Sequence, residues 1–380
     1  MLLHKIIGAV TVAIWAGPIL AATQKERQLS STTNLCVSVI AIAGSPDYRY
    51  LQENDIDIDI FDQGEEFVCE LSTGLTVPIK GTHEQMQQMQ SLLDEGKLIS
   101  AEMTIGIADD LITVEGDDSA YLPPGEIILA PRNDRRKKQR ARKMLKGGGG
   151  SYPDIDNHDN RRNLADPYKR TYEGNKPILV VRVTDSSGKV HEDDANTMSD
   201  KIFGTDGDVA NAKSQFAACS YGKLIVTNDY TEDISQHLAA PGVIEIDIPI
   251  TLEGNDRNTI RSKLILAAQS KLGFALPGPF QHVMFVIERC YTDCGWAAYA
   301  YVNSWLSVYQ GDNYKFVGVQ MHEIGHNLNL AHSGGLDGKS YTDHSCLMGN
   351  PFYSDDEGAM CYNPAKSFQI ARGGGSWYNE

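Results

Sequence analysis

Short runs of alternating apolar and polar residues characterise the first third of the chain. They are rich in β-branched residues and are separated by Gly, Asp and Pro, a pattern that predicts strands. The predicted strands are residues 36–43, 67–72, 75–79 and 101–108. Residues 83–96 instead place apolar side chains at helical spacing and end at Gly96, which predicts a helix. We therefore expect residues 23–131 to form a small, mostly β domain.

From residue 152 to residue 380 the pattern changes to strands that alternate with helices. The predicted strands are 177–185, 223–230, 242–250, 282–289 and 295–309. The predicted helices are 209–220, 255–273 and 316–332. The run 177–185 is mostly apolar, which is typical of a strand buried on both faces. The expected fold class is α+β, with a mixed sheet and helices preceded by the small β domain.

A basic, glycine-rich segment, residues 132–151, separates the two regions. It holds nine of the 34 Lys and Arg residues, and Gly147–Gly150 follow them. Segments of this composition are flexible, exposed and readily cleaved, and residues 140–143 suit a processing protease that reads paired basic residues. We interpret 132–151 as a cleavable linker and 23–131 as a propeptide. A solvated or nucleic-acid-binding tail, or a nuclear address, would have a similar composition.

Residues 1–22 have the layout of a secretory signal peptide. Lys5 precedes an almost uncharged apolar run from Ile6 to Leu20, and the small residues Ala21 and Ala22 follow it. A membrane anchor is the alternative, but the run is shorter than the roughly twenty apolar residues that span a bilayer. We expect a secreted, extracellular protein with no stable membrane insertion.

The net charge and the number of cysteines agree with an extracellular location. The formal net charge is −16 although the linker is strongly basic, so the rest of the chain is acidic and nucleic acid is not the expected partner. Seven cysteines fit an oxidising compartment, and an odd number leaves at least one unpaired. They are Cys36, Cys69, Cys219, Cys290, Cys294, Cys346 and Cys361.

The segment HEIGHNLNLAH, residues 322–332, carries the candidate chemistry. His322 and His326 are four residues apart, so on a helix they lie on one face and can reach one zinc ion at about 2.0–2.1 Å. Zinc lowers the pKa of a bound water to about 7, and Glu323 lies where it can take the proton of that water. This is the H-E-x-x-H pattern of metalloproteases.

A third ligand is expected at His332, six residues after His326. A straight helix would carry His332 too far along its axis, so the helix must stop near residue 329 and turn back. Asn329 occupies the position that needs a positive φ, a conformation that Asn tolerates better than most residues. The alternative is a polar helix face that holds histidines with ordinary hydrogen-bond partners.

These residues resemble the metzincin signature H-E-x-x-H-x-x-G-x-x-H, with Asn329 in the glycine position. Residues 341–350 are similar to the loop that places a methionine beneath the zinc, which makes Met348 the Met-turn residue. Within the metzincins, HEIGHNLNLAHS together with DHSCLMG is most similar to the gametolysin group of secreted algal peptidases. The likeness covers roughly residues 175–370, and the residues after it depart from the usual close of the family, as in a shortened C-terminus.

The resemblance implies a secreted zinc endopeptidase, made as a zymogen, that cuts matrix or cell-wall glycoproteins. His322, His326 and His332 would be the metal ligands, Glu323 the general base, and Met348 an apolar floor beneath the imidazoles. Some metzincins carry a tyrosine ligand two residues after this methionine, but here that residue is Asn350. The other reading is a catalytically inactive zinc-binding matrix or adhesion protein of the same fold.

Two further features have alternative interpretations. In metzincins an edge strand over the cleft binds the substrate as an added strand, and residues 295–303 are the candidate, unless they form an ordinary aromatic core strand. Cys36 and Cys69 have two readings, of which we favour a disulfide bond between them. Alternatively, one of their thiolates caps the zinc until the linker is cut.

Overall fold

The computed structural model describes a subset of the chain, and all structural statements below refer to it. The described residues are 36–46, 66–71, 76–94, 98, 103–105, 113–115, 119–122, 129–131, 173–289, 295–336, 339–349, 360–372 and 377. The predicted signal peptide (1–22), the predicted linker (132–151), Cys290, Cys294 and Asn350 lie outside these residues, and so do most of the final ten residues.

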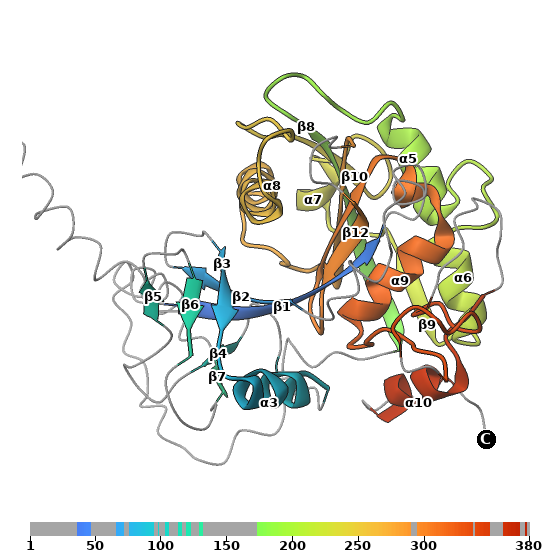
Figure 1. The fold of residues 1–380 in the computed structure, drawn as a ribbon. Coiled ribbons are helices and arrows are strands. Elements are labelled where there is room, and N and C mark those ends of the chain that lie inside the picture. Colours follow the sequence, from blue (N-terminus) through green and yellow to red (C-terminus); the bar gives the residue numbers. More distant parts are fainter. Residues whose placement is uncertain are drawn as a thin grey trace, which may run out of the picture.

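A mixed sheet forms the centre of the C-terminal region (Figure 1). Its strands follow the order β10 (Val243–Asp247), β8 (Gly174–Thr184), β11 (His282–Ile287), β13 (Leu306–Gln310) and β12 (Trp296–Tyr301). The first four strands are parallel, and β12 runs antiparallel to β13. A short strand, β9 (Leu224–Thr227), pairs in parallel with the start of β8.

Apolar residues on both faces explain why this sheet lies at the centre. Along β8, Ile178 and Val180 belong to one core cluster, whereas Leu179 and Val181 belong to a second cluster across the sheet. Because all four side chains are fully buried, neither face of the strand can face water. The mostly apolar run 177–185 therefore forms the buried strand that was predicted.

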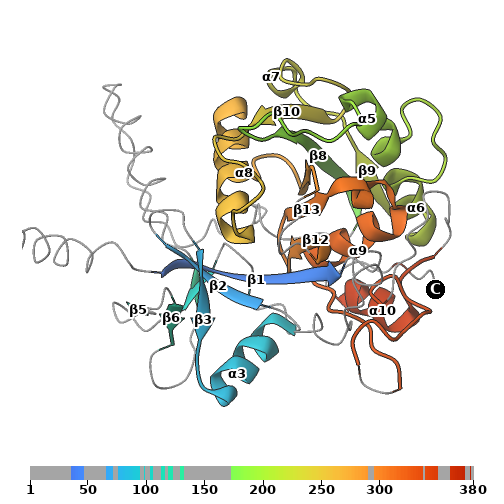
Figure 2. The same ribbon diagram turned by 45° about the horizontal axis from the view of Figure 1, so that its top comes forward.

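Helices cover the two faces of the sheet (Figures 1 and 2). On one side lie α5 (Ala195–Phe203), α6 (Ala212–Cys219), α9 (Val317–Asn327) and α10 (Pro364–Arg372), and on the other lies α8 (Arg257–Leu272). Two shorter elements, α7 (Glu232–Ser235) and η2 (Gly311–Lys315), connect strands and helices. Among the described residues, none of the helices has the length and apolar character that crossing a membrane requires.

Local capping explains most of the helix boundaries. The Asp256 side chain accepts hydrogen bonds from the backbone N–H groups of Asn258 and Thr259, so α8 begins at Arg257. It ends where Gly273 adopts φ = 78°, close to the predicted limits of 255–273. Asn211 caps α6 in the same way, so this helix begins at residue 212 and not at 209.

Among the residues that the structure describes, the N-terminal region contributes a small β layer and the helix α3. Its elements are β1 (Cys36–Pro46), β2 (Glu66–Leu71), β3 (Thr76–Lys80), α3 (His83–Asp94), β4 (Met103–Ile105), β5 (Thr113–Glu115), β6 (Ser119–Tyr121) and β7 (Leu129–Pro131). The first half of β1 pairs with β2, and residues 42–46 pair antiparallel with β12. The sheet therefore continues from the C-terminal region into the N-terminal region.

Three expectations differ from the structure. The run 295–309 forms two strands, β12 and β13, because the chain reverses around Asn303 at φ = 52°. The predicted helix 316–332 ends at Asn327, and α5 was not predicted at all. Of the described cysteines, Cys219 and Cys361 form a disulfide bond with each other, Cys69 is also disulfide-bonded, and Cys346 is buried without such a bond.

The side chain of Asn327 fixes the C-terminal end of α9 to the sheet. Its amide N–H group donates to the carbonyl oxygens of Tyr301 at 2.8 Å and Leu306 at 3.0 Å, the residues at the two ends of the β12–β13 turn. Its side-chain oxygen lies 3.2 Å from Nδ1 of His282. The backbone N–H of Asn303 adds a bond of 2.9 Å to the carbonyl of His326. These contacts are buried, so each one depends on the others being in place.

We expect Asn327→Leu to lower the free energy of unfolding by about 2–4 kcal/mol, because it leaves two buried carbonyl groups without their donor. Urea denaturation followed by circular dichroism measures the change. Asn255→Leu is the matched control, because the Asn255 amide makes one local bond to Thr251 on a partly exposed loop. Equal stability losses in the two variants would contradict this account of Asn327.

Candidate metal centre

Helix α9 presents His322, Glu323 and His326 to the interior, where none of the three side chains is exposed. Gly325, in the same turn of α9, leaves space for the side chain of Met348. A Cβ atom on Gly325 would lie only 2.4 Å from the sulfur of Met348, so this position has no space for a side chain. Met348 therefore packs directly against the turn of α9 that carries both histidines.

The chain turns sharply after α9 and brings His332 back toward the helix. Asn329 adopts φ = 65°, in the left-handed region. The backbone N–H of Leu330 donates to the carbonyl of Gly325 at 3.0 Å, and the side chain of Gln369 in α10 donates to the carbonyl of Asn329 at 2.8 Å. This reversal has the position and the backbone geometry that the spacing of His326 and His332 requires.

The imidazoles of His322, His326 and His332 converge on one point. One ring nitrogen from each residue lies within 4.8 Å of the other two, so the three could hold one metal ion. The Nε2 atoms of His322 and His326 are 3.2 Å apart. Two nitrogens bound to one tetrahedral zinc ion at about 2.0–2.1 Å would be roughly 3.4 Å apart, close to this separation.

The outer nitrogens of two rings are fixed by carbonyl groups. Nδ1 of His322 lies 2.6 Å from the carbonyl oxygen of Leu347, and Nδ1 of His326 lies 2.8 Å from that of Leu330. A carbonyl oxygen only accepts hydrogen bonds, so both Nδ1 atoms carry the proton. These bonds orient the rings and direct Nε2 toward the centre, the usual arrangement around metal-binding histidines.

Burial keeps all three rings neutral. It lowers the pKa of His322 to about 4, and it lowers the pKa of His326 and of His332 well below the usual value. A neutral ring with its proton on Nδ1 has a bare lone pair on Nε2. His322 and His326 thus point two lone pairs at each other across 3.2 Å, an unfavourable arrangement unless a cation lies between them. The donor set therefore fits a metal ion such as zinc.

The carboxylate of Glu323 lies in the same buried environment. Burial raises the pKa of the neighbouring Tyr309 well above its usual value, and the negative charge of Glu323 contributes as the second cause. Glu323 therefore lies near enough to Tyr309 of β13 for its charge to act on that hydroxyl, and its side chain is fully buried.

Tyr341 is a residue of the site that the sequence analysis missed. Its hydroxyl oxygen lies 2.7 Å from Nε2 of His332, and the hydroxyl group donates to the backbone carbonyl of Gly44 in β1. Its ring packs against that of His332, with centroids 4.1 Å apart. Tyr341 lies in the same predicted loop as Met348, which is the sequence feature that could have indicated it. The metzincin signature, however, does not distinguish this tyrosine from the other sixteen in the chain.

The predicted edge strand, residues 295–303, forms β12 at the edge of the C-terminal sheet. Its free side is occupied by β1, with Ile42 opposite Tyr301 and Gly44 opposite Tyr299. In both views the end of β1 points toward α9 (Figures 1 and 2). The side chains of Tyr299 and Tyr301 are buried in the core. The segment is therefore a core strand by its side chains, and its backbone edge is the side that pairs with β1.

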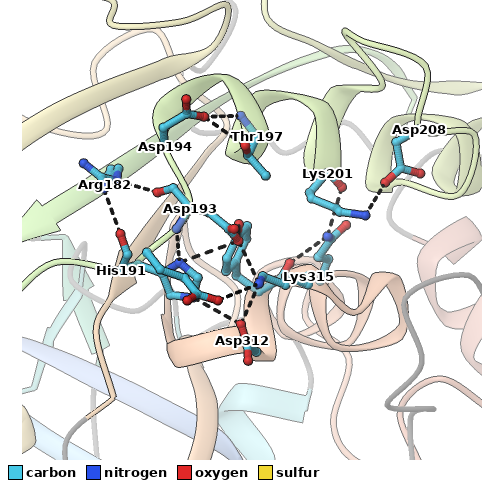
Figure 3. Close-up of polar contacts among 12 residues, drawn as sticks. Arg182, His191, Asp193, Asp194, Thr197, Lys201, Asp208, Asp312 and Lys315 are labelled. Carbon is cyan, nitrogen blue, oxygen red and sulfur yellow. Dashed lines mark hydrogen bonds and ion pairs between the residues drawn. The ribbon is translucent and has the colours of Figure 1, made fainter.

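A second cluster of His and Asp residues has a different character. His191, Asp193 and Asp312 could hold a metal ion by distance alone, but Figure 3 shows Lys315 among them. The Lys315 ammonium group lies 2.9 Å from Asp193 and 2.7 Å from Asp312. Although burial opposes it, the bonds to Asp312 and Asp193 raise the pKa of Lys315, so its charge already neutralises the carboxylates. We interpret this cluster as an ion-pair network.

The sequence match agrees with the geometry of the histidine cluster. Residues 188–374 match the family model described as gametolysin peptidase M11, and this range includes α9, the turn at Asn329 and Met348. No curated protein and no solved structure matches the chain. The resemblance to the gametolysin group is confirmed. Through residues 188–374 the chain belongs to the gametolysin peptidase M11 family, a family of zinc metallopeptidases, and is therefore a metalloendopeptidase.

Proposed function

We propose that this peptidase is secreted as a zymogen and cuts extracellular-matrix or cell-wall proteins with zinc held by His322, His326 and His332. The observation that carries the proposal is the pair of Nε2 atoms 3.2 Å apart, together with a fully buried glutamate that follows His322 in the same helix. Glu323 is the proposed general base. A metal-binding protein without activity would not require a carboxylate at this position.

When bound, zinc acts as a Lewis acid and lowers the pKa of water from 15.7 to about 7. Glu323 accepts a proton from the attacking water at its carboxylate while the water oxygen bonds to the carbonyl carbon of the substrate. Glu323 then passes this proton to the amide nitrogen as the carbon–nitrogen bond breaks. One product leaves as an amine and the other as a carboxylic acid, so water is the only other reactant consumed.

The loop around Met348 supports this chemistry without taking part in it. The carbonyl of Leu347 orients His322, and the sulfur of Met348 fills the space beneath Gly325. The backbone N–H of Ser333 donates to the carbonyl of Met348 at 2.7 Å, which ties the loop to the segment that carries His332. We assign Met348 the role of the Met-turn residue, an apolar floor and not a ligand.

Several observations support secretion and latency. The disulfide bond between Cys219 and Cys361 fits an oxidising compartment, as do the features of residues 1–22. Residues 42–46 of β1 cover the side of β12 to which an extended substrate would bind. Cys69 is disulfide-bonded, so it has no thiolate with which to cap the metal. Strand pairing is therefore the basis that we propose for latency, and cleavage within 132–151 is the proposed release.

We expect Glu323→Gln to reduce kcat by at least 10³-fold while one zinc ion per chain is retained. The amide has nearly the shape of the carboxylate but cannot take the proton. Hydrolysis of a generic protein substrate and metal content by mass spectrometry are the measurements. Glu245→Gln on β10 is the control, because Glu245 is half-exposed and bonds to Arg182 away from the site. Full activity of Glu323→Gln would exclude this mechanism.

We expect His332→Ala to lower zinc affinity by 10-fold or more, because two imidazoles cannot complete the coordination that three provide. Competition with a chelator of known affinity measures the change. Complete removal of the metal from the wild-type chain should abolish hydrolysis, and added zinc should restore it. His344→Ala is the control, since His344 lies in the loop before Met348 but is exposed. Equal zinc affinity in both variants would remove His332 from the ligand set.

We expect Ile42→Asp to raise the activity of the uncleaved chain several-fold. Ile42 is buried among residues of β12, including Tyr299 and Tyr301, so a carboxylate there weakens the pairing of β1 with β12. Hydrolysis before and after nicking of the linker by trypsin gives the comparison. Lys80→Asp, at an exposed position of β3, is the control for a new carboxylate in the N-terminal region. Unchanged latency in Ile42→Asp would show that β1 does not block the site.

A further inference from the structure

One peptide carbonyl already lies at the metal centre. The Tyr341 hydroxyl donates to the carbonyl of Gly44, and the same hydroxyl oxygen is 2.7 Å from Nε2 of His332. Gly44 belongs to the part of β1 that pairs antiparallel with β12, where it lies opposite Tyr299. The Gly44 carbonyl is therefore presented by an extended strand on the sheet edge, as the carbonyl of a bound peptide would be.

A hydroxyl group has one proton, which limits what Tyr341 can do. Because it donates this proton to Gly44, it can only accept a hydrogen bond from His332. If Nε2 of His332 binds a metal, that nitrogen has no proton to donate, and the contact with Tyr341 is then one of proximity only. The proton of the hydroxyl remains available to a carbonyl in either state.

We propose that Tyr341 is a catalytic residue whose hydroxyl binds the carbonyl oxygen of the peptide bond that is cut. This inference rests on the proposed function, and Gly44 stands in for the substrate in the uncleaved chain. When β1 leaves, a substrate strand that pairs with β12 in the same register places its own carbonyl oxygen at the Tyr341 hydroxyl.

The surroundings of Tyr341 hold its hydroxyl in place before a substrate arrives. The side chain is 5% exposed, and its ring is nearly parallel to that of His322, with an interplanar angle of 12° and a centroid distance of 6.0 Å. Its backbone has φ = 64°, a conformation disfavoured for residues with a side chain. Such a conformation persists when its surroundings impose it, and it is more frequent at functional sites than elsewhere.

The hydrogen bond should matter more as the reaction proceeds. When water adds to the carbonyl carbon, the carbonyl oxygen gains negative charge, and a donor aimed at it binds the transition state more tightly than the substrate. Loss of one such donor typically costs 10²–10³-fold in kcat. The structural role of a buried tyrosine would instead alter stability or metal binding.

The first test uses the full chain, folded and then nicked within residues 132–151 with trypsin. We expect Tyr341→Phe to lower kcat roughly 10²-fold, with KM within about threefold and zinc content unchanged. Tyr230→Phe is the control, because the Tyr230 hydroxyl also donates to a backbone carbonyl, that of Ile178 in β8. Wild-type kcat in Tyr341→Phe, or loss of zinc from it, would overturn the proposal.

The second test reads the carbonyl contact without turnover. In the uncleaved Glu323→Gln chain, Tyr341→Phe should speed hydrogen exchange of the backbone amides in residues 42–45 several-fold and leave α9 unchanged. Unchanged exchange in 42–45 would overturn the contact on which the proposal stands. If the wild-type chain hydrolyses no protein, the proposed function fails by itself, and faster exchange would still support Tyr341 as the group that binds a peptide carbonyl.

Discussion

The geometry of the site depends on the attachment of the end of α9 to the sheet. The amide of Asn327 bonds to carbonyls at both ends of the β12–β13 turn, and His326 receives a backbone bond from Asn303 within that turn. Since His326 precedes Asn327 and the reversal at Asn329 follows it, a shift of this end would move two of the three imidazoles. The same attachment fixes the strand beside which β1 lies.

The part of the site that the sequence predicted is the part that local geometry controls. The spacing of His322 and His326 depends only on the helical repeat, and the need for a turn near Asn329 follows from helix length. Tyr341 could not be predicted in this way, because its partner Gly44 is 297 residues away and is brought to it by the pairing of β1 with β12. The turn at Asn303 was missed because aromatic residues continue on both sides of it.

In the proposed zymogen, the edge of β12 has two successive roles, first as the partner of β1 and then as the binding site of the substrate. An unpaired edge exposes backbone N–H and C=O groups that pair readily with any extended chain. Residues 42–46 pair with this edge, and the carbonyl of Ala41 also accepts a bond of 2.9 Å from the N–H of Val302. On this proposal an activating cut need not reshape the catalytic region, because removal of β1 exposes the backbone groups of β12 in the geometry that they already have.

Burial determines the properties of the proposed ligands, the proposed base and the proposed donor alike. It holds the three imidazoles neutral, as metal binding requires, and it places two bare nitrogens opposite each other. A buried carboxylate such as Glu323 is costly unless a positive charge lies nearby. A cation held between His322 and His326 would relieve the repulsion of their lone pairs and would also stabilise the charged form of Glu323, the proposed base. In the proposed mechanism, metal binding and proton transfer are therefore coupled, because both depend on the exclusion of water from the same buried side chains.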